Sequence, residues 1–142
     1  MNGTLRWAFS GTVLVAGLAL AAHGLPAPAE AAEPGPTSPG QELPAGVTAE
    51  MVEQGSELYA GAALCLTCHG AAGAGTPVGP ALNDGEWLGV DGSYESLVEV
   101  ITEGVTEPVQ YGAVMLPRGG SGISDEEVEA VAAYVWTLSH GG

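Results

Sequence analysis

The sequence predicts an all-α domain of three to five short helices joined by long loops, and three observations support this class. Apolar residues recur at helical spacing in three segments, near residues 48–60, 93–103 and 124–139. The stretches between these segments are rich in glycine and proline, which interrupt regular structure. No segment shows the alternation of apolar and polar residues that is typical of a strand. We therefore expect helices packed on one another, with irregular chain covering the rest of the domain.

The first helix is expected to run from Thr48 to about residue 60. Thr48 is a suitable N-cap, and Glu50 and Glu53 lie in or next to the first turn, where the helix dipole favours acidic side chains. Residues at helical spacing then follow, namely Met51, Val52, Gly55, Leu58, Tyr59 and Ala62. Glycine is costly inside a helix, so Gly55 indicates the close approach of another helix at that point.

Two further helices are expected after residue 90. Ser93 begins the first, which should end near Glu103, because Gly104 is a stop signal. Its inward side chains are expected to be Leu97, Val98 and Ile101. The last helix is the best defined, because Ser124 and Glu127 can form a capping box at its start. Its apolar stripe consists of Val128, Val131, Ala132, Val135 and Leu138.

The N-terminal third of the chain is not expected to belong to this domain. Residues 1–31 are typical of a secretory signal peptide, since Arg6 precedes an apolar run and residues 29–31 form a small-x-small cleavage site. An uncleaved membrane anchor is the alternative, although the run is shorter than the roughly 20 apolar residues of a spanning helix. Residues 32–47 are rich in proline and glycine, and we expect a solvated linker before the domain at residues 48–142.

The stretch Cys65-Leu-Thr-Cys-His69 carries the most specific chemical signal in the chain. Two cysteines three positions apart, with a histidine directly after the second, form the attachment signature of a c-type haem. On one turn of helix the two thiols point the same way, so both can form thioethers with the vinyl groups of one porphyrin. The histidine can then bind the iron through an imidazole nitrogen. We therefore expect Cys65 and Cys68 to hold one covalent haem c, with His69 as its proximal ligand.

Three other uses of these residues are weaker. A structural zinc site needs four ligands, whereas the chain has two cysteines and three histidines, one of which is His23 near the N-terminus. A redox dithiol of the thioredoxin kind would need a surrounding βαβ pattern, which the sequence does not show. A structural disulfide would leave His69 without a role.

The composition is strongly acidic. Asp and Glu number 17 against 2 Lys and Arg, which gives a formal net charge of −15. Such a surface repels nucleic acid and anionic membranes, and it attracts basic partners. Solubility in a salty habitat would account for the same composition, and the sequence alone does not separate the two explanations.

With these elements in order, residues 48–142 resemble the class I cytochrome c family. The matching features, in chain order, are Gly55 and Tyr59, the haem motif, Gly79-Pro80-Ala-Leu82, Met115, Ser124-Asp-Glu-Glu and Ala133-Tyr134-Val135. The resemblance implies the cytochrome c fold around one covalently attached haem. In that fold the first and last helices cross at right angles with a small residue at the crossing, which would place Gly55 against the Val131–Tyr134 region.

The resemblance also bears on the axial ligands. Pro80 matches the loop proline whose carbonyl usually binds the second nitrogen of the proximal histidine. Met115 falls where family members place their axial thioether, and it lies in a loop rich in proline and glycine. His140 as a second histidine ligand, or a vacant sixth position, are the alternatives.

Two further residues are candidates for contacts with the haem propionates. Trp87 could donate its indole N–H to a propionate, and core packing is the alternative. Arg118 is the only cation after residue 31 and could also pair with a propionate, although an exposed loop arginine is the simpler reading.

Iron bound by imidazole and thioether has no open site, and the thioether raises the reduction potential. We therefore predict a periplasmic one-electron carrier and not an enzyme, because no second catalytic group accompanies the motif. The first alternative is a tethered or fixed haem subunit of a terminal oxidase or dehydrogenase, whose haem modules the segment from Trp87 to Ile101 resembles. The second is a haem peroxidase or gas sensor with Met115 unbound. The expected partners are redox proteins with basic docking surfaces, with membrane contact only through a retained N-terminal segment.

Overall fold

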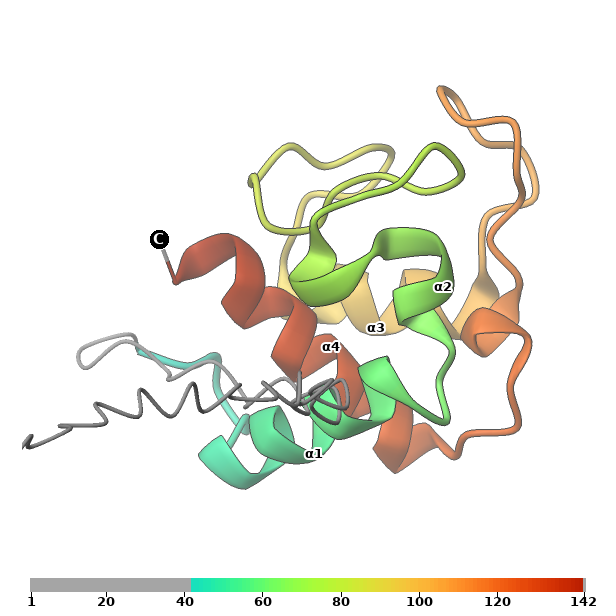
Figure 1. Ribbon diagram of the computed structural model, residues 1–142. Helices are drawn as coiled ribbons and strands as arrows, with labels where there is room; N and C mark the ends of the chain where they lie inside the picture. Colours follow the sequence, from blue (N-terminus) through green and yellow to red (C-terminus); the bar gives the residue numbers. More distant parts are fainter. Residues whose placement is uncertain (1–41, 142) are drawn as a thin grey trace, which may run out of the picture. The chain divides into compact units, whose positions relative to one another are not determined.

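The computed structural model describes residues 42–141, which fold as an all-α unit without a sheet (Figure 1). Its elements in chain order are α1 (Ala49–Ala60), α2 (Cys65–His69), the 3-10 turn η1 (Ala71–Gly73), α3 (Tyr94–Glu103), the 3-10 turn η2 (Pro117–Gly120) and α4 (Asp125–His140). Isolated bridges pair Thr76 with Gly79 and Val105 with Met115. The predicted all-α class is therefore confirmed.

The three predicted helices begin at the predicted caps. Thr48 accepts a hydrogen bond from the backbone N–H of Met51 at 3.3 Å, and Ser93 caps α3 in the same way. At α4 the capping box is complete, since the backbone of Glu127 donates to the Ser124 hydroxyl at 3.3 Å and the backbone of Ser124 donates to the Glu127 carboxylate at 2.7 Å. Local hydrogen bonding therefore fixes where each helix starts.

The most extensive contact between two elements of the described region joins α1 to α4, and Gly55 lies at its closest point. A Cβ added to Gly55 would lie 1.9 Å from the carbonyl oxygen of Ala130 and 2.9 Å from the Cβ of Tyr134. One turn along α1, the rings of Tyr59 and Tyr134 meet edge to face, with centroids 5.3 Å apart. The predicted close approach at Gly55 is therefore confirmed, because only a hydrogen fits there.

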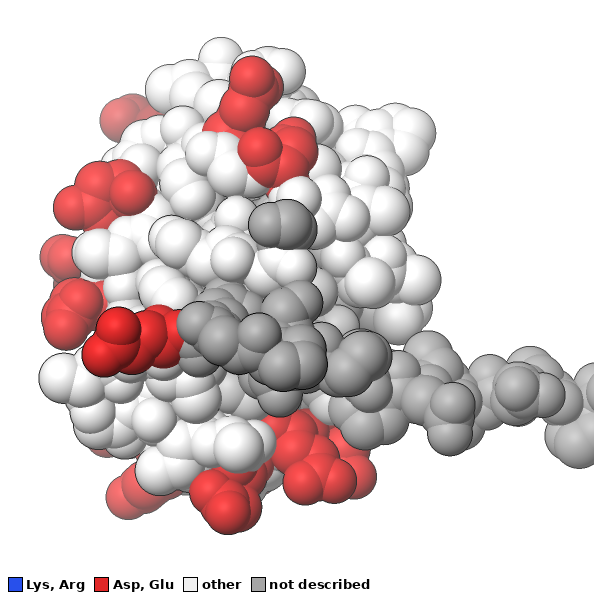
Figure 2. Space-filling model, turned by 90° about the vertical axis from the view of Figure 1, so that its left-hand side faces the viewer, with Lys and Arg blue, Asp and Glu red and all other residues white. Residues whose placement is uncertain are grey.

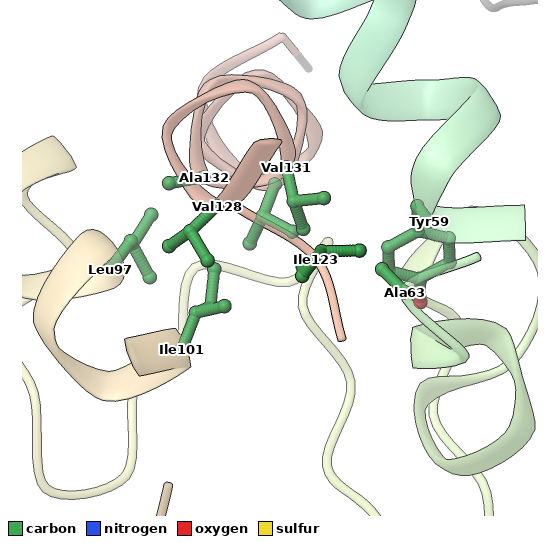
Figure 3. Close-up of a cluster of buried hydrophobic side chains, with 9 residues drawn as sticks. Tyr59, Ala63, Leu97, Ile101, Ile123, Val128, Val131 and Ala132 are labelled. Atoms are coloured by element: carbon green, nitrogen blue, oxygen red, sulfur yellow. The ribbon is translucent and has the colours of Figure 1, made fainter. Parts of the chain in front are cut away.

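The core lies around α4, which packs between α1 and α3. Figure 3 shows Leu97 and Ile101 of α3 on one side of α4, and Tyr59 and Ala63 on the other. The buried cluster consists of Tyr59, Ala63, Leu97, Ile101, Ile123, Val128, Val131, Ala132 and Val135. Four residues of the apolar stripe expected on the last helix thus belong to the core, whereas the fifth, Leu138, is partly exposed and lies outside the cluster.

The N-terminal predictions fall largely outside the described residues. This holds for the signal segment, residues 1–31, and for residues 32–41 of the linker. The end of the linker is described, and Leu43 packs there against a cluster of Val47, Val52 and Ala133. The linker is predicted to be solvated, whereas at this end Leu43 and Val47 contact the domain, although the segment has no periodic apolar pattern. None of the helices described is long and apolar enough to cross a bilayer.

Candidate functional site

A cavity of about 960 Å³ lies among the helices and the two long loops of the described region. Every α-helix contributes to its wall, through Tyr59 of α1, Cys65 of α2, Leu97 of α3 and Val131 of α4. The lining is mostly apolar. Its volume is in the range of pockets that hold a cofactor-sized ligand. Six of the candidate site residues singled out from the sequence line this cavity, namely Cys65, Cys68, His69, Pro80, Trp87 and Met115.

Both cysteines line the cavity from α2, and both are free thiols. Cys65 is partly buried, with its sulfur 3.5 Å from the carbonyl oxygen of Ala63, whereas Cys68 is exposed. Burial raises the pKa of the Cys65 thiol to about 11. Their spacing places the two thiols on one face of a short helix, which is the arrangement that attachment to a single planar group requires.

His69 ends α2, lines the cavity and is 9% exposed. Its Nδ1 lies 2.9 Å from the carbonyl oxygen of Pro80. A carbonyl oxygen only accepts hydrogen bonds, so Nδ1 carries the proton and the lone pair resides on Nε2. Burial also lowers the pKa of His69, which favours the neutral ring. A neutral imidazole with one nitrogen held by the protein is the form that ligates metals.

The loop after α2 is tied closely to the back of the motif. The backbone N–H of Gly75 donates to the carbonyl of His69 at 2.7 Å, and the Thr76 hydroxyl donates to the carbonyl of Cys68 at 2.6 Å. A Cβ added to Gly79 would lie 2.6 Å from that same Cys68 oxygen. The glycine-rich sequence therefore lets the loop press against α2, and this brings the Pro80 carbonyl within reach of the imidazole.

Met115 lines the same cavity from the loop before η2. Its backbone N–H donates to the carbonyl of Val105 at 3.0 Å, and its carbonyl accepts from the Val105 N–H at 2.8 Å. Glycine at position 104 permits this contact, because an added Cβ would lie 2.4 Å from the Met115 oxygen. The backbone of Met115 is thus held by Val105 through both its N–H and its carbonyl, an anchoring that the sequence pattern did not reveal.

His140, the alternative ligand, does not line the cavity. Its ring stacks on Trp136 with centroids 4.1 Å apart, and its Nδ1 lies 2.9 Å from the Trp136 carbonyl oxygen. The geometry therefore gives no support to ligation by two histidines.

The two residues considered for propionate contacts differ in their positions. Trp87 lines the cavity, is partly buried and packs against the core cluster. Arg118 does not line the cavity, and its guanidinium pairs with Asp125 and donates to the carbonyl oxygen of Ile123 at 2.8 Å. The expected contact of Arg118 with a propionate finds no support in this arrangement.

Tyr59 is a cavity residue whose role the sequence did not reveal. It is 1% exposed, and its hydroxyl donates to the carbonyl of Gly70 at 2.9 Å. Burial raises the pKa of Tyr59, so the phenol stays neutral and keeps donating. In the sequence Tyr59 is one of several residues on a helical face, and nothing local distinguishes a wall of the cavity from ordinary core.

Comparison with known proteins agrees with this geometry. A family model described as cytochrome c oxidase, cbb3-type, subunit III matches residues 50–135, which is more than half of the chain. The chain belongs to this cytochrome c family. No curated protein and no solved structure matches it. Membership of the cbb3-type subunit III family identifies a c-type cytochrome domain, which implies covalent haem c and electron transfer.

The donor set of this cytochrome domain fits a haem better than a bare metal ion. Two thiols on one helical face, a neutral imidazole and a thioether share one apolar cavity. Within residues 42–141, no three His, Cys, Asp or Glu side chains cluster as a metal site would require. A zinc site is therefore not supported, whereas a large apolar group with one iron atom would use all four side chains.

Proposed function

We propose that this cytochrome domain is an extracytoplasmic one-electron carrier with a single haem c. Cys65 and Cys68 form the thioethers, His69 is the proximal ligand and Met115 is the distal ligand. The observation that carries the proposal is that one cavity is lined by all four side chains, although Met115 is distant from the motif in the sequence. When bound, the haem supplies an iron that changes its charge by one electron without leaving the site.

The residues of the chain keep both ligands in place. The Pro80 carbonyl orients His69 at 2.9 Å, and the paired backbone bonds with Val105 hold Met115. Trp87 lines the cavity and is our candidate for an N–H donor to a propionate. If His69 and Met115 both bound the iron, the chain would leave no open position for small ligands, and the haem would supply one-electron chemistry with little rearrangement of these side chains.

The surface near the cavity is suited to brief contact with a redox partner. Apolar side chains that line the cavity are nonetheless exposed, among them Val109 at 81%, Leu116 at 54% and Leu64 at 51%. Acidic side chains lie among them, such as Glu103 and Glu107. On the face drawn in Figure 2, acidic side chains are spread over the described surface. An apolar patch among carboxylates favours a partner with a basic docking surface.

A second candidate is a haem subunit held in a terminal oxidase complex, which the family description favours because it names subunit III of a cbb3-type oxidase. A retained N-terminal segment would tether it. Washing native membranes with salt separates the two candidates. A diffusing carrier leaves with the wash, whereas a fixed subunit sediments with the membranes and the other oxidase subunits.

The absorption spectrum of the holoprotein beside that of Met115→Ala tests the ligand set. The ferric wild type should show the weak band at the red end of the spectrum that arises from iron–sulfur ligation, and Met115→Ala should lack it. The pigment should stay with the polypeptide during acid–acetone extraction in both proteins. Absence of the red band from the wild type, with ready binding of azide, would favour a peroxidase or gas sensor instead.

A further inference from the structure

Arg118 is the only lysine or arginine between residues 42 and 141, and it is not used at the cavity. Its Nη1 donates to the carbonyl oxygen of Ile123 at 2.8 Å, and its Nη2 pairs with the carboxylate of Asp125. Asp125 is the first residue of α4, and Ile123 belongs to the core. The arginine side chain therefore joins the loop after Met115 to the start of the central helix.

Residues 115–123 form a strap that connects the cavity to α4. At one end, Met115 is held by its two backbone bonds with Val105. In the middle, Gly119 lies against the carbonyl oxygen of Ala63, since an added Cβ would approach it to 2.3 Å. Among the side-chain hydrogen bonds of the described residues, only the pair of Arg118 with Asp125 ties a side chain of the strap to a residue outside it, since the bond to Ile123 lies within the strap.

The backbone of the strap needs such a tie. Arg118, Gly119 and Gly120 have φ angles of 53°, 66° and 79°, so three consecutive residues lie in the left-handed region. This conformation is unfavourable for a residue with a Cβ and persists only where its surroundings hold it. The Ser121 N–H and hydroxyl both donate to the carbonyl oxygen of Arg118, at 3.1 Å and 2.6 Å, and the Arg118 side chain, 25% exposed, adds the two contacts of its guanidinium.

We propose that Arg118 is a positioning residue that keeps the Met115 thioether in the cavity by fixing the strap to α4. The proposal rests on the proposed function, in which Met115 is the distal ligand. Arg118 is separated from Met115 by two residues that make no side-chain hydrogen bond. When the guanidinium is lost, the strap loosens from its α4 end and the thioether leaves the iron more often. Exogenous ligands then compete better for the sixth position.

Azide titration of the ferric holoprotein measures this competition, together with the intensity of the red iron–sulfur band. Arg118→Gln should raise the azide affinity roughly tenfold, the size expected for the loss of a partly exposed charge-assisted hydrogen-bond pair. Asp125→Asn should give a smaller increase, and Arg118→Lys should fall between wild type and Arg118→Gln, because an ammonium cannot span both acceptors. Glu126→Gln removes a neighbouring charge without touching Arg118 and should match the wild type.

A double-mutant cycle shows whether the effect acts through Met115. In the Met115→Ala background, Arg118→Gln should not change the azide affinity further. A tenfold gain in that background as well would overturn the proposal. So would wild-type azide affinity in Arg118→Gln, Asp125→Asn and Arg118→Lys alike.

Two comparisons distinguish a positioning role of Arg118 from a failure of Met115 ligation and from a general loss of stability. A wild type without the red band would refute Met115 ligation itself, whereas a normal wild type with unaffected Arg118 variants would refute only the role of Arg118. Thr48→Ala removes the N-cap of α1, far along the chain from the strap. Should Thr48→Ala raise azide affinity as much as Arg118→Gln at equal loss of stability, the positioning role is overturned.

Discussion

The Nδ1 of His69 lies 2.9 Å from the carbonyl oxygen of Pro80, so the ring is oriented by backbone and not by another side chain. No substitution at position 80 removes that acceptor, and its position depends on how closely the loop approaches α2. The approach is set at Gly79, where an added Cβ would lie 2.6 Å from the carbonyl oxygen of Cys68. The orientation of the proposed proximal ligand therefore depends on a neighbouring glycine.

Gly79→Ala should displace the Pro80 carbonyl and weaken its bond to His69. A less strongly held N–H makes the imidazole a poorer donor to ferric iron, so the reduction potential should rise. We expect a rise of roughly 30–60 mV. For a one-electron couple this is about a three- to tenfold change in the ratio of reduced to oxidised protein at a given potential. Potentiometric titration of the holoprotein measures it. Gly112→Ala is the control, since nothing lies within 4 Å of its added Cβ, and an equal potential in all three proteins would refute the prediction.

Gly55→Ala should force α1 away from α4, because the new methyl group would meet the Ala130 carbonyl oxygen at 1.9 Å. We expect the free energy of unfolding to fall by about 3 kcal/mol, at the upper end of overpacking effects. Urea denaturation of the holoprotein provides the measurement. Gly112→Ala again serves as the control and should change the free energy by no more than about 0.5 kcal/mol. A stable Gly55→Ala protein would show that the two helices slide apart without cost.

The protein without haem should be largely unfolded. The domain expected over residues 48–142 is small for a self-sufficient core, and the cavity of about 960 Å³ leaves the inner faces of its helices without packing partners. A Cys65→Ala, Cys68→Ala double variant produced without haem should show little fixed near-ultraviolet circular dichroism and no cooperative thermal transition. A sharp transition in that protein would mean that the helices alone are sufficient.

The loss of stability in acid should depend in part on Asp91, which lies two residues before Ser93, the N-cap of α3. Its carboxylate accepts from the Ser93 hydroxyl at 2.7 Å and from the Ser93 N–H at 2.9 Å, and these bonds, with one from Ser96, lower its pKa to about 2. Because the folded pKa lies below the unfolded value of 3.8, the contribution to stability is complete above about pH 5 and is lost as the pH falls toward 2.

Asp91→Asn tests this linkage by urea denaturation at several pH values. The wild type should exceed the variant in free energy of unfolding by a constant amount above pH 5, roughly one unit beyond the unfolded pKa. The difference should shrink as the pH falls toward 2, where the folded carboxylate becomes protonated. A difference that persists unchanged at low pH would assign the effect to packing and not to charge.

Electron exchange with a basic redox protein should slow as salt is added. The formal net charge of −15 attracts such a partner over long range, and salt at about 0.15 M screens charges separated by more than about 8 Å. Stopped-flow rates at increasing sodium chloride provide the test, and an acidic redox protein should show the opposite slope. A rate that is independent of ionic strength would mean that the apolar contacts alone determine docking.

Sequence reasoning worked where the determining interactions are local. Ser124 and Glu127 cap each other within one helical turn, so the start of α4 could be read from four residues. The motif from Cys65 to His69 is likewise contiguous, and its side chains line the cavity from one short helix. At Gly55 the mismatch between residue and helix indicated a close neighbour, which the structure supplies.

Contacts between two irregular segments could not be predicted from the sequence. The Val105–Met115 bridge is a single pairing, and one pair has no periodicity to detect. The Arg118–Asp125 pair links a loop to a helix through side chains, and any exposed acid would have been an equal candidate. Leu43 was missed for a related reason, because an isolated apolar residue among prolines has no pattern of burial.

The crossing of α1 and α4 also constrains the order in which the parts of the domain can fold. Its two halves come from opposite ends of the described chain, so docking must close a loop that contains the haem motif and Met115. Because the polypeptide emerges with its N-terminus first, Cys65 and Cys68 become accessible before α4, which completes the core, has emerged. Shortening α4 would therefore leave α1 without its main neighbour, instead of trimming an edge of the domain.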